Sequence, residues 1–289
     1  MDLSLLRDAA LAGALLGCFY AAVAIGLTLS FGLLDVPVVA HPAFVIAGGY
    51  GVVLLGHAGV PPLVAGLLLV PVFFGFGWLL YSFYDRAFER RGEDASTRGI
   101  AFFFGIAFIV EVTLAMTFGV DAQMVETGLR GKSLEVAGLR LPLRMLVAAG
   151  VSLLMAAALG LYLKRSFAGQ AMAGVAQDPM ALQLVGGNPA AVRRLAFAIG
   201  TATVAIAGGL MVMIGPIEPA LGRQYIGKVF AICVLAGLGS IRGTIVAAIL
   251  LGVAENIVLG TWGSSWAPAV AFAILLLVLA VKPTGLYGR

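Results

Sequence analysis

Charged residues are scarce in this sequence, and their scarcity excludes a water-soluble globular protein. Only 11% of the 289 residues are Asp, Glu, Lys or Arg, whereas 61% are hydrophobic and the mean hydropathy is +1.06. A soluble domain carries about 25% charged residues, because water must wet its surface. Lipid must therefore surround most of this chain. No stretch is polar enough to form a soluble unit, so we expect residues 1–289 to be one transmembrane domain.

Cysteine and histidine are also rare, with two of each. Cys18 and Cys233 lie inside apolar runs, where cysteine acts as a small hydrophobic residue. No CxxC pair or Cys/His metal spacing occurs, and no Ser/His/Asp set converges, so we expect no catalytic residue and no metal site. The net charge of +4 does not indicate nucleic acid, because the basic residues cluster in short loops beside apolar runs, as in membrane proteins.

A nucleotide-binding loop is missing as well. The nearest string, GKS at residues 131–133, has Glu126 where the pattern GxxxxGK[ST] requires its leading glycine. We therefore expect no cofactor to be bound by this chain.

Long uncharged runs are what the sequence has in abundance. A helix needs about 20 apolar residues to cross the hydrocarbon core. Because open sheet edges cannot face lipid, the runs predict an all-α, polytopic membrane helical bundle. The segment at 229–241 is the exception, since 13 residues span only about 20 Å as a helix, which predicts a short, broken helix there. About eight to nine hydrophobic segments result, at residues 9–34, 36–56, 63–84, 99–118, 145–163, 195–217, 229–241, 243–260 and 266–281.

The segments outside these runs indicate a topology. Residues 133–141 alternate around Ala137 and Gly138, which favours a small hairpin. Placing loops 85–98 and 164–194 on the same side as the end of the chain collects most of the basic residues there. The positive-inside rule makes that side cytoplasmic. Small residues at Gly13 and Gly17 and at Gly239 and Gly243 allow close helix contacts, either within the chain or with a partner.

The loop between the fifth and sixth runs contains signals for a short helix. Asp178 is a good N-cap, Pro179 suits the first helical position, and Gly186 suits the C-terminal stop. The predicted helix presents Met180, Leu182, Leu184 and Val185, with Ala181 between them. Apolar side chains on a short, capped helix favour docking to a partner. A helix lying on the membrane surface, or packed on its own bundle, would show the same pattern.

Polar residues inside apolar runs are candidates for a solute pathway, because a charge in the membrane is costly. For Glu111, lining the solute pathway and packing between helices are equally supported roles. For Glu255 we expect a structural role. His41 and Pro42 lie in an irregular segment at 35–42, which also contains Asp35 and Pro37; a second irregular segment at 237–243 contains Gly237, Gly239 and Ser240. Paired interrupted helices indicate a midplane binding site in transporters. His57 lies in a turn and is expected to be solvated.

The loop sequence carries a resemblance to a known family. The run GQAMAGVAQDPMALQLVG at residues 169–186 closely resembles the cytoplasmic coupling segment of branched-chain amino acid ABC transporter permeases. The resemblance continues, in order, through AIGLTLSFG at 24–32, AGGY at 47–50, AGGL at 207–210, LAGLGSIRG at 235–243, LGVAE at 251–255 and KPTGL at 282–286. It covers nearly the whole chain and is closer to the family's first permease subunit than to its longer partner.

The resemblance implies the permease subunit of an importer in a bacterial inner membrane. It implies pairing with a second permease subunit or a second copy of the chain. It also implies two ATP-binding subunits, which use ATP and dock on Asp178, Pro179, Met180, Ala181, Leu182, Val185 and Gly186, and a periplasmic solute-binding protein. The chain itself would not be an enzyme. An ion-coupled secondary transporter is the alternative, but it needs no capped docking helix.

One departure from the family bears on the solute. The family has an Asn-Phe-Ala-His-Gly-Glu type run after the first span, whereas this chain has VVAHPA at residues 38–43. His41 is kept, but Val38 and Ala43 replace the Asn and the Glu. If those two residues help to select a zwitterionic amino acid, the selectivity here is altered. Amides, urea, and aliphatic or aromatic acids then become candidate solutes beside amino acids.

Overall fold

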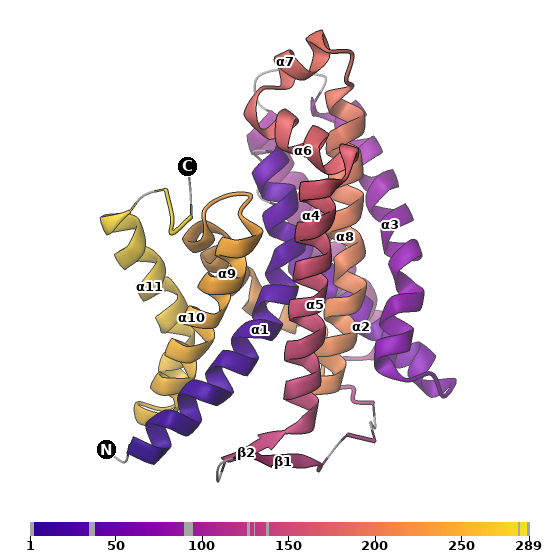
Figure 1. Cartoon of the computed structure of the whole chain (residues 1–289). Coiled ribbons are helices and arrows are strands. Elements are labelled where there is room, and N and C mark those ends of the chain that lie inside the picture. The colour runs from indigo at the N-terminus through magenta and orange to yellow at the C-terminus, as the bar shows by residue number, and fades with distance from the viewer. Residues whose placement is uncertain are drawn as a thin grey trace.

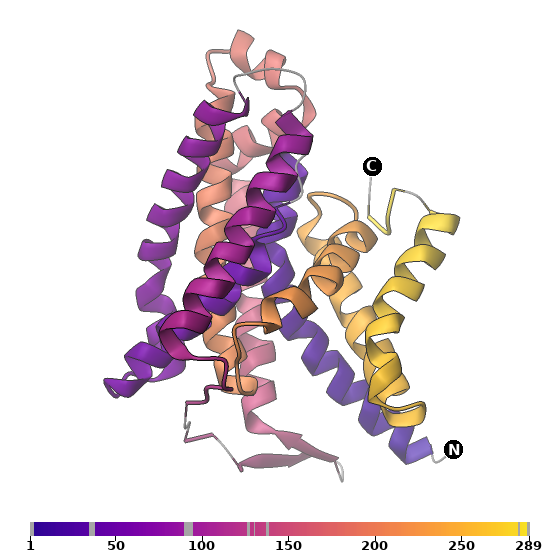
Figure 2. The ribbon, with the colours of Figure 1, turned by 180° about the vertical axis from the view of Figure 1, so that it is seen from behind.

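The computed structural model describes residues 3–34, 38–89, 95–125, 128–129, 131–136, 139–282 and 284–287. It is a bundle of helices with one small hairpin, as Figures 1 and 2 show, and it confirms the all-α class. Asp35, Pro37, Glu126, Ala137 and Gly138, which entered the sequence analysis, lie outside the described residues. The helices are α1 (Leu3–Leu34), α2 (His41–His57), α3 (Pro62–Ala87), α4 (Ala95–Phe118), α5 (Leu143–Arg165), α6 (Phe167–Gln177), α7 (Pro179–Leu184), α8 (Pro189–Ile214), α9 (Leu221–Ala236), α10 (Ile241–Thr261) and α11 (Ala267–Val281), with a 3₁₀ turn η2 at Ser264–Trp266.

Seven of the described helices are long and apolar enough to cross a membrane. Helices α2 and α9 are shorter, with 17 and 16 residues. The sequence predicted one short segment, and α2 is a second. It begins only at His41, after a turn in which the His41 N–H donates to the Val38 carbonyl oxygen (3.0 Å). Pro42 lies in its first turn, where proline favours a helix start.

The predicted bounds of the short helix at 229–241 were wrong. Helix α9 begins eight residues earlier, at Leu221, and ends at Ala236, where Gly237 has φ +87°. The prediction relied on the absence of charge, but α9 includes Arg223 and Lys228. Both cations pair with carboxylates on other helices. Pairing makes a charge tolerable inside a membrane bundle, so charge alone did not mark the start of the helix.

The connecting segments divide between two ends of the bundle. Strands β1 (Ser133–Val136) and β2 (Leu139–Pro142) pair antiparallel with Leu134 opposite Leu141, which confirms the predicted hairpin. The hairpin lies at the same end as the N-terminus, and α6 and α7 lie at the opposite end (Figure 1). The segment before the hairpin also reaches the start of α9, because Gln123 and Ile217 exchange backbone hydrogen bonds (2.7 and 2.9 Å).

The end of α9 is completed by the last residues of the chain. The N–H groups of Leu286 and Tyr287 donate to the carbonyl oxygens of Leu235 and Ala236, at 2.8 and 3.1 Å. The last carbonyls of a helix have no partner within the helix itself. The segment 285–287 supplies those partners at a helix end that lies within the bundle.

Close backbone contacts hold α1 against its neighbours. A methyl group on Gly26 would lie 2.3 Å from the Gly200 carbonyl oxygen on α8. On the other side, a methyl group on Gly252 of α10 would lie 2.4 Å from the Gly13 carbonyl oxygen and 2.6 Å from the Gly17 nitrogen. The predicted small residues Gly13 and Gly17 therefore pack within the chain. Helices in lipid associate through such close packing, since burial from water no longer favours association.

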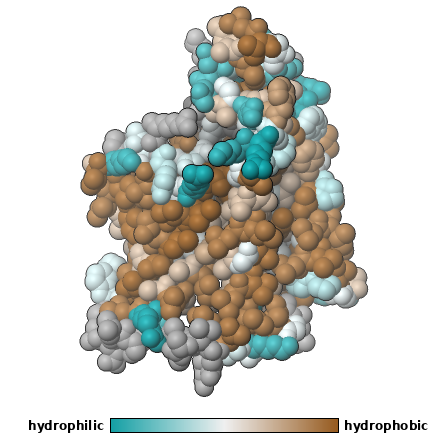
Figure 3. Space-filling model, viewed as in Figure 1, coloured by the Kyte–Doolittle hydropathy of each residue, from teal (hydrophilic) through white to brown (hydrophobic). Residues whose placement is uncertain are grey.

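The outward faces of α3, α4 and α11 carry large apolar side chains that are exposed in the isolated chain. Examples are Leu79, Met116 and Leu276, with 70%, 85% and 69% exposed. Figure 3 shows the apolar surface as a broad belt, with hydrophilic atoms concentrated above and below it. The belt is the surface that meets the hydrocarbon core.

The α1–α10 contact leads to a stability prediction. Gly252→Val should lower the free energy of unfolding by about 1–3 kcal/mol, because the added atoms overpack the contact with α1. Gly150→Val on α5 is the matched control, since nothing lies within 4 Å of a methyl group at Gly150. Denaturant unfolding in a mild detergent measures both. Equal stability of the two variants would contradict the predicted contact.

Candidate functional site

Helix α7 forms as the sequence predicts. Asp178 Oδ1 accepts hydrogen bonds from the N–H groups of Met180 (2.8 Å) and Ala181 (3.0 Å), which confirms it as the N-cap. Pro179 lies in the first turn. Gly186 follows the helix with φ +84°, the left-handed conformation that glycine adopts without strain. Local caps therefore fix this six-residue helix.

The apolar residues of α7 point in two directions. Met180, Leu184 and Val185 are 71%, 84% and 81% exposed. Leu182 instead turns inward, where its side chain lies against Gly187 and approaches Gly174. The prediction that Leu182 is presented for docking was wrong, because its side chain fills the space under the helix. The outward apolar surface of α7 thus consists of Met180, Leu184 and Val185.

Helix α6 supports α7 and was not predicted as a separate helix. Ser166 Oγ accepts a hydrogen bond from the Gly169 N–H (2.9 Å) and starts the helix, while Met172 and Val175 are buried. A methyl group on Gly169 would lie 2.4 Å from the backbone of Leu163, so α6 folds tightly back on the end of α5. The serine cap is the signal that could have identified it.

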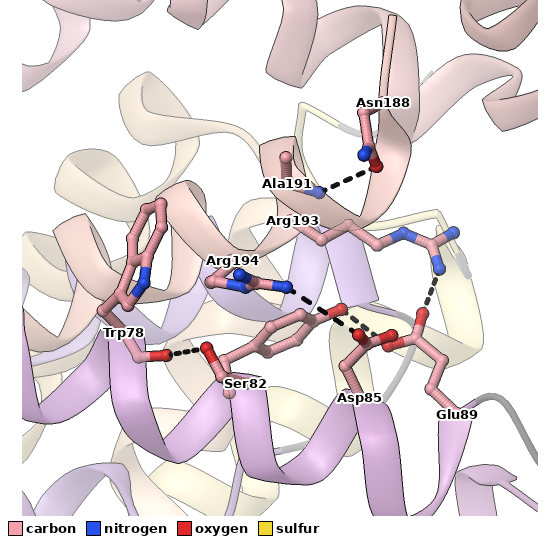
Figure 4. A network of polar contacts seen from close by, with 9 residues as sticks. Trp78, Ser82, Asp85, Glu89, Asn188, Ala191, Arg193 and Arg194 are labelled. Atoms are coloured by element: carbon pink, nitrogen blue, oxygen red, sulfur yellow. Dashed lines mark hydrogen bonds and ion pairs between the residues drawn. The ribbon is translucent and has the colours of Figure 1, made fainter.

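An ion cluster joins the end of α3 to the first turns of α8, the helix that follows α7 in the chain (Figure 4). Helix α8 begins with Asn188, whose Oδ1 accepts from the Ala191 N–H (3.2 Å). One turn later the Arg193 guanidinium donates to Glu89, which also accepts from the Tyr81 hydroxyl (2.6 Å). The start of α8, which four residues separate from α7, is thereby tied to the end of α3.

A second pair strengthens the same junction. Arg194 Nη2 lies 3.9 Å from Asp85 Oδ2, and its guanidinium carbon lies 5.4 Å from the centre of the Trp78 ring. Figure 4 shows both arginines reaching from α8 toward carboxylates on the α3 side. Sequence reasoning missed this cluster, although acidic residues ending one span and basic residues starting another were a usable signal.

His41 and Pro42 lie at the buried start of α2. His41 is 2% exposed and donates from Nε2 to the Val23 carbonyl oxygen on α1 (3.1 Å). Its ring also lies where a methyl group on Gly26 would be, at 2.6 Å. The histidine fills a gap between α1 and α2, and its predicted place in the pathway stays a prediction.

Glu111 forms a pair that the sequence did not reveal. Its Oε1 lies 2.7 Å from Nη2 of Arg223 on α9, and the arginine side chain is 66% exposed. The two residues line a small pocket of about 40 Å³ between α4, α9 and the start of α2, together with Ala43. Because Ile217, just before α9, pairs with Gln123, α9 approaches this pocket from the hairpin side of the bundle. We call Glu111, Arg223 and Ala43 the mouth cluster.

Gly237, Gly239 and Ser240 lie elsewhere, at the far end of α9. Gly237 and Gly239 have φ +87° and +78° and form the turn into α10, and Ser240 Oγ caps α10 by accepting from the Gly243 N–H (3.1 Å). Gly239 packs against Gly32 of α1. The structure therefore divides the predicted pathway residues between the two ends of α9 and does not gather them at one point.

Glu255 is paired inside the bundle. It accepts from the Tyr20 hydroxyl (2.9 Å) and from Lys228 Nζ, so α1, α9 and α10 meet at one carboxylate. Lys228 Nζ also lies 5.1 Å and 5.6 Å from the ring centres of Tyr20 and Tyr225. The structural role predicted for Glu255 now has named partners, and Lys228 is a residue that the sequence analysis did not single out.

The buried pair leads to a second stability prediction. Lys228→Met should destabilise the protein by about 3–5 kcal/mol, because it leaves Glu255 buried without its cation. Adding Glu255→Leu to the same variant should recover part of that loss. Arg223→Met, at the 66% exposed cation of the same helix, is the control and should cost much less. Thermal unfolding in detergent is the measurement, and a double variant no more stable than the single one would refute the pairing argument.

Metal chemistry has no support among the described residues. No group of three or more His, Cys, Asp or Glu side chains is placed to hold a metal ion within the searched part of the chain. Cys18 and Cys233 are buried and free. What the described residues offer is a pattern of paired charges between helices and one exposed apolar helix beyond the membrane belt.

Known proteins resemble this chain along almost its whole length. Residues 9–279 match the family described as the branched-chain amino acid transport system / permease component. The permease protein LivH of the high-affinity branched-chain amino acid transport system of Escherichia coli is 30% identical, over 96% of this chain and 94% of its own length. BraD, the permease protein of the high-affinity branched-chain amino acid transport system of Pseudomonas aeruginosa, is 29% identical, also over 96% of this chain and 94% of its own length.

A more distant relative is archaeal. The probable branched-chain amino acid transport permease protein LivH of Methanocaldococcus jannaschii is 24% identical, over 92% of this chain and 87% of its own. No solved structure gives a significant match.

The family match covers most of the chain, and the seven membrane-length helices agree with it. The chain therefore belongs to the permease component family of branched-chain amino acid transport systems, and it is a multi-pass inner-membrane permease.

Proposed function

We propose that this chain is the permease subunit of an ABC importer for branched-chain amino acids or similar small solutes with an apolar body. Family membership supports the class of transporter. The observation that carries the mechanism is α7, whose caps are satisfied locally while Met180, Leu184 and Val185 are almost fully exposed. A rigid helix with an uncovered apolar surface is a docking element for another protein.

The position of α7 favours docking over the two alternatives. It lies beyond the ends of α5 and α8, at the top of the molecule in Figure 1, and outside the apolar belt of Figure 3. A helix lying on the membrane surface would instead sit at the edge of that belt. Packing on its own bundle accounts for Leu182 alone. An ion-coupled secondary transporter would have no use for this surface.

We infer a set of partners that fits this arrangement. Two ATP-binding subunits dock on α7 and its counterpart in a second permease subunit or a second copy of this chain, and they hydrolyse the ATP. A periplasmic solute-binding protein meets the hairpin end. The ion cluster of Glu89, Arg193, Asp85 and Arg194 ties the start of α8, the next helix after α7, to the end of α3, so movement at α7 would reach α3 through it.

Coupling is tested by a charge on the outward surface of α7. Leu184→Glu should reduce ATP-driven uptake in reconstituted vesicles by roughly tenfold or more, because docking would bury an unpaired charge. Gln170→Glu, an exposed position on α6, introduces the same charge outside α7 and should transport normally. The amount of folded protein in the membrane should be equal for both. Wild-type uptake by Leu184→Glu would remove the docking role of α7.

The solute route is proposed to start at the mouth cluster. Glu111 and Arg223 present one carboxylate and one guanidinium side by side near the start of α9, which matches the two poles of a zwitterion. Helix α9 then runs past Lys228 toward the turn at Gly237, Gly239 and Ser240, which we retain as the inner end of the route.

The wall of the proposed route near its start includes residues of α2. His41 and Pro42 border the route from the start of that helix. Because Val38 is buried and Ala43 lines the pocket, the wall at the mouth contributes few hydrogen bonds.

Arg223 is the residue on which this route is tested. Arg223→Gln should slow uptake of a zwitterionic amino acid several-fold, while solute affinity at the isolated binding protein stays unchanged. Arg223→Lys keeps the charge and should retain part of the rate. Folding should survive in both, since the side chain is mostly exposed. Unchanged uptake in Arg223→Gln would place the route away from the mouth cluster.

A further inference from the structure

A large groove lies on the side of the bundle near the α6 end. It has a volume of about 740 Å³, within the range of about 300–1,000 Å³ typical of ligand pockets. Its walls come from α1, α5, α6 and α10, and small residues dominate them, which leaves a smooth apolar channel. The lining includes Ala156, Ala157, Gly160, Ala173 and Ala176.

Two basic side chains stand on the rim of this groove. Lys164 lies in the last turn of α5 and Arg242 in the first turn of α10, and both are exposed. Neither forms an ion pair with any residue that the structure describes. The cations Arg193, Arg194, Arg223 and Lys228 all do so. Two unpaired positive charges above an apolar channel fit a ligand that has an anionic group and an apolar chain.

The position of the two basic residues along the bundle fits a ligand with an anionic headgroup and an apolar chain. Both basic residues lie where membrane-length helices end, at the same end of the bundle as α6. The channel beneath them is made by the transmembrane parts of α1, α5 and α10. Figure 3, seen from the side that shows α1 and α5, has hydrophilic atoms above the apolar belt at this level. A headgroup at the rim and a chain in the channel would match this layering.

We propose that the groove binds an anionic phospholipid, with its phosphate between Lys164 and Arg242 and an acyl chain along the small residues of α5 and α6. Basic pockets between transmembrane helices on the cytoplasmic side are suited to acidic headgroups. A second groove of about 790 Å³, between α3, α5 and α8, differs from the first in that its lining contains no charged residue. That groove can hold an acyl chain but cannot distinguish headgroups.

The bound lipid would bridge elements that the protein itself leaves separate. Its headgroup would link the end of α5 to the start of α10, and its chain would lie under α6, the support of α7. Ser240, at the turn after α9, is on the same rim. The proposed lipid therefore sits between the coupling segment and the inner end of α9, and does not depend on which solute is carried.

Headgroup preference is the first test. The full-length chain is reconstituted in vesicles of phosphatidylcholine containing spin-labelled phosphatidylglycerol, and the immobilised fraction gives the relative affinity of the two lipids. A basic residue that contacts an acidic headgroup contributes about fivefold to the preference for acidic lipid. Lys164→Gln with Arg242→Gln should therefore lose at least about fivefold. Arg165→Gln with Lys282→Gln removes the same charge from positions that do not line the groove and should lose much less of the preference. Equal losses in both double variants would reduce the effect to general surface charge and overturn the site.

The second test identifies the molecule that occupies the groove. A photoreactive benzoylphenylalanine replaces Leu161, which lines the groove, and in a second variant Leu154, which lines the uncharged groove. After irradiation of the assembled transporter in membranes, mass spectrometry should find phosphatidylglycerol adducts enriched several-fold at Leu161 over Leu154. A Leu161 probe that captures only a protein subunit would show that another chain covers the groove. Equal lipid adducts at both positions would also contradict the proposal.

Discussion

The rest of the structure depends on the direct backbone contact that α1 makes with α8 on one side and with α10 on the other. Gly26 meets Gly200, and Gly13 and Gly17 meet Gly252, at distances that no side chain would permit. In lipid, burial from water no longer draws helices together, so such contacts supply the association. They also bring the first helix against helices made much later in the chain. Polar links at Tyr20–Glu255 and Thr28–Thr244 (both 2.9 Å) then fix its rotation.

Charges inside the bundle follow a single arrangement, in which each cation reaches a carboxylate on a different helix. On α9, Arg223 reaches α4 and Lys228 reaches α10. On α8, Arg193 and Arg194 reach the end of α3. Polar pairing between helices has directional demands that apolar packing lacks, so these pairs specify which faces meet. These pairs hold the short helix α9 near its start, at Arg223, and near its middle, at Lys228.

The sequence allowed the helices, the hairpin and α7 to be predicted, because the signals for them are local. Apolar runs locate spans, and the Asp178 cap and Gly186 stop act within a few residues of each other. The start of α9 and the inward turn of Leu182 could not be obtained in this way. The start of α9 depends on Glu111 and Glu255, which meet Arg223 and Lys228 only in the folded chain. The direction of Leu182 depends on how the chain after α7 turns back to bring Gly187 against it, which an apolar pattern does not show. For the same reason the family resemblance was accessible from sequence, whereas Arg223 and Lys228 were not identified as site residues.

The pairing of residues 286 and 287 with the end of α9 has a consequence for biogenesis. About fifty residues separate Ala236 from these partners, so α10 and α11 must be synthesised and inserted before the last carbonyls of α9 are satisfied. Until then the last carbonyls of α9 lack these partners. The hydrogen bonds that complete this helix can therefore form only after two further helices have been made, so the end of α9 is among the last parts of the bundle to be closed.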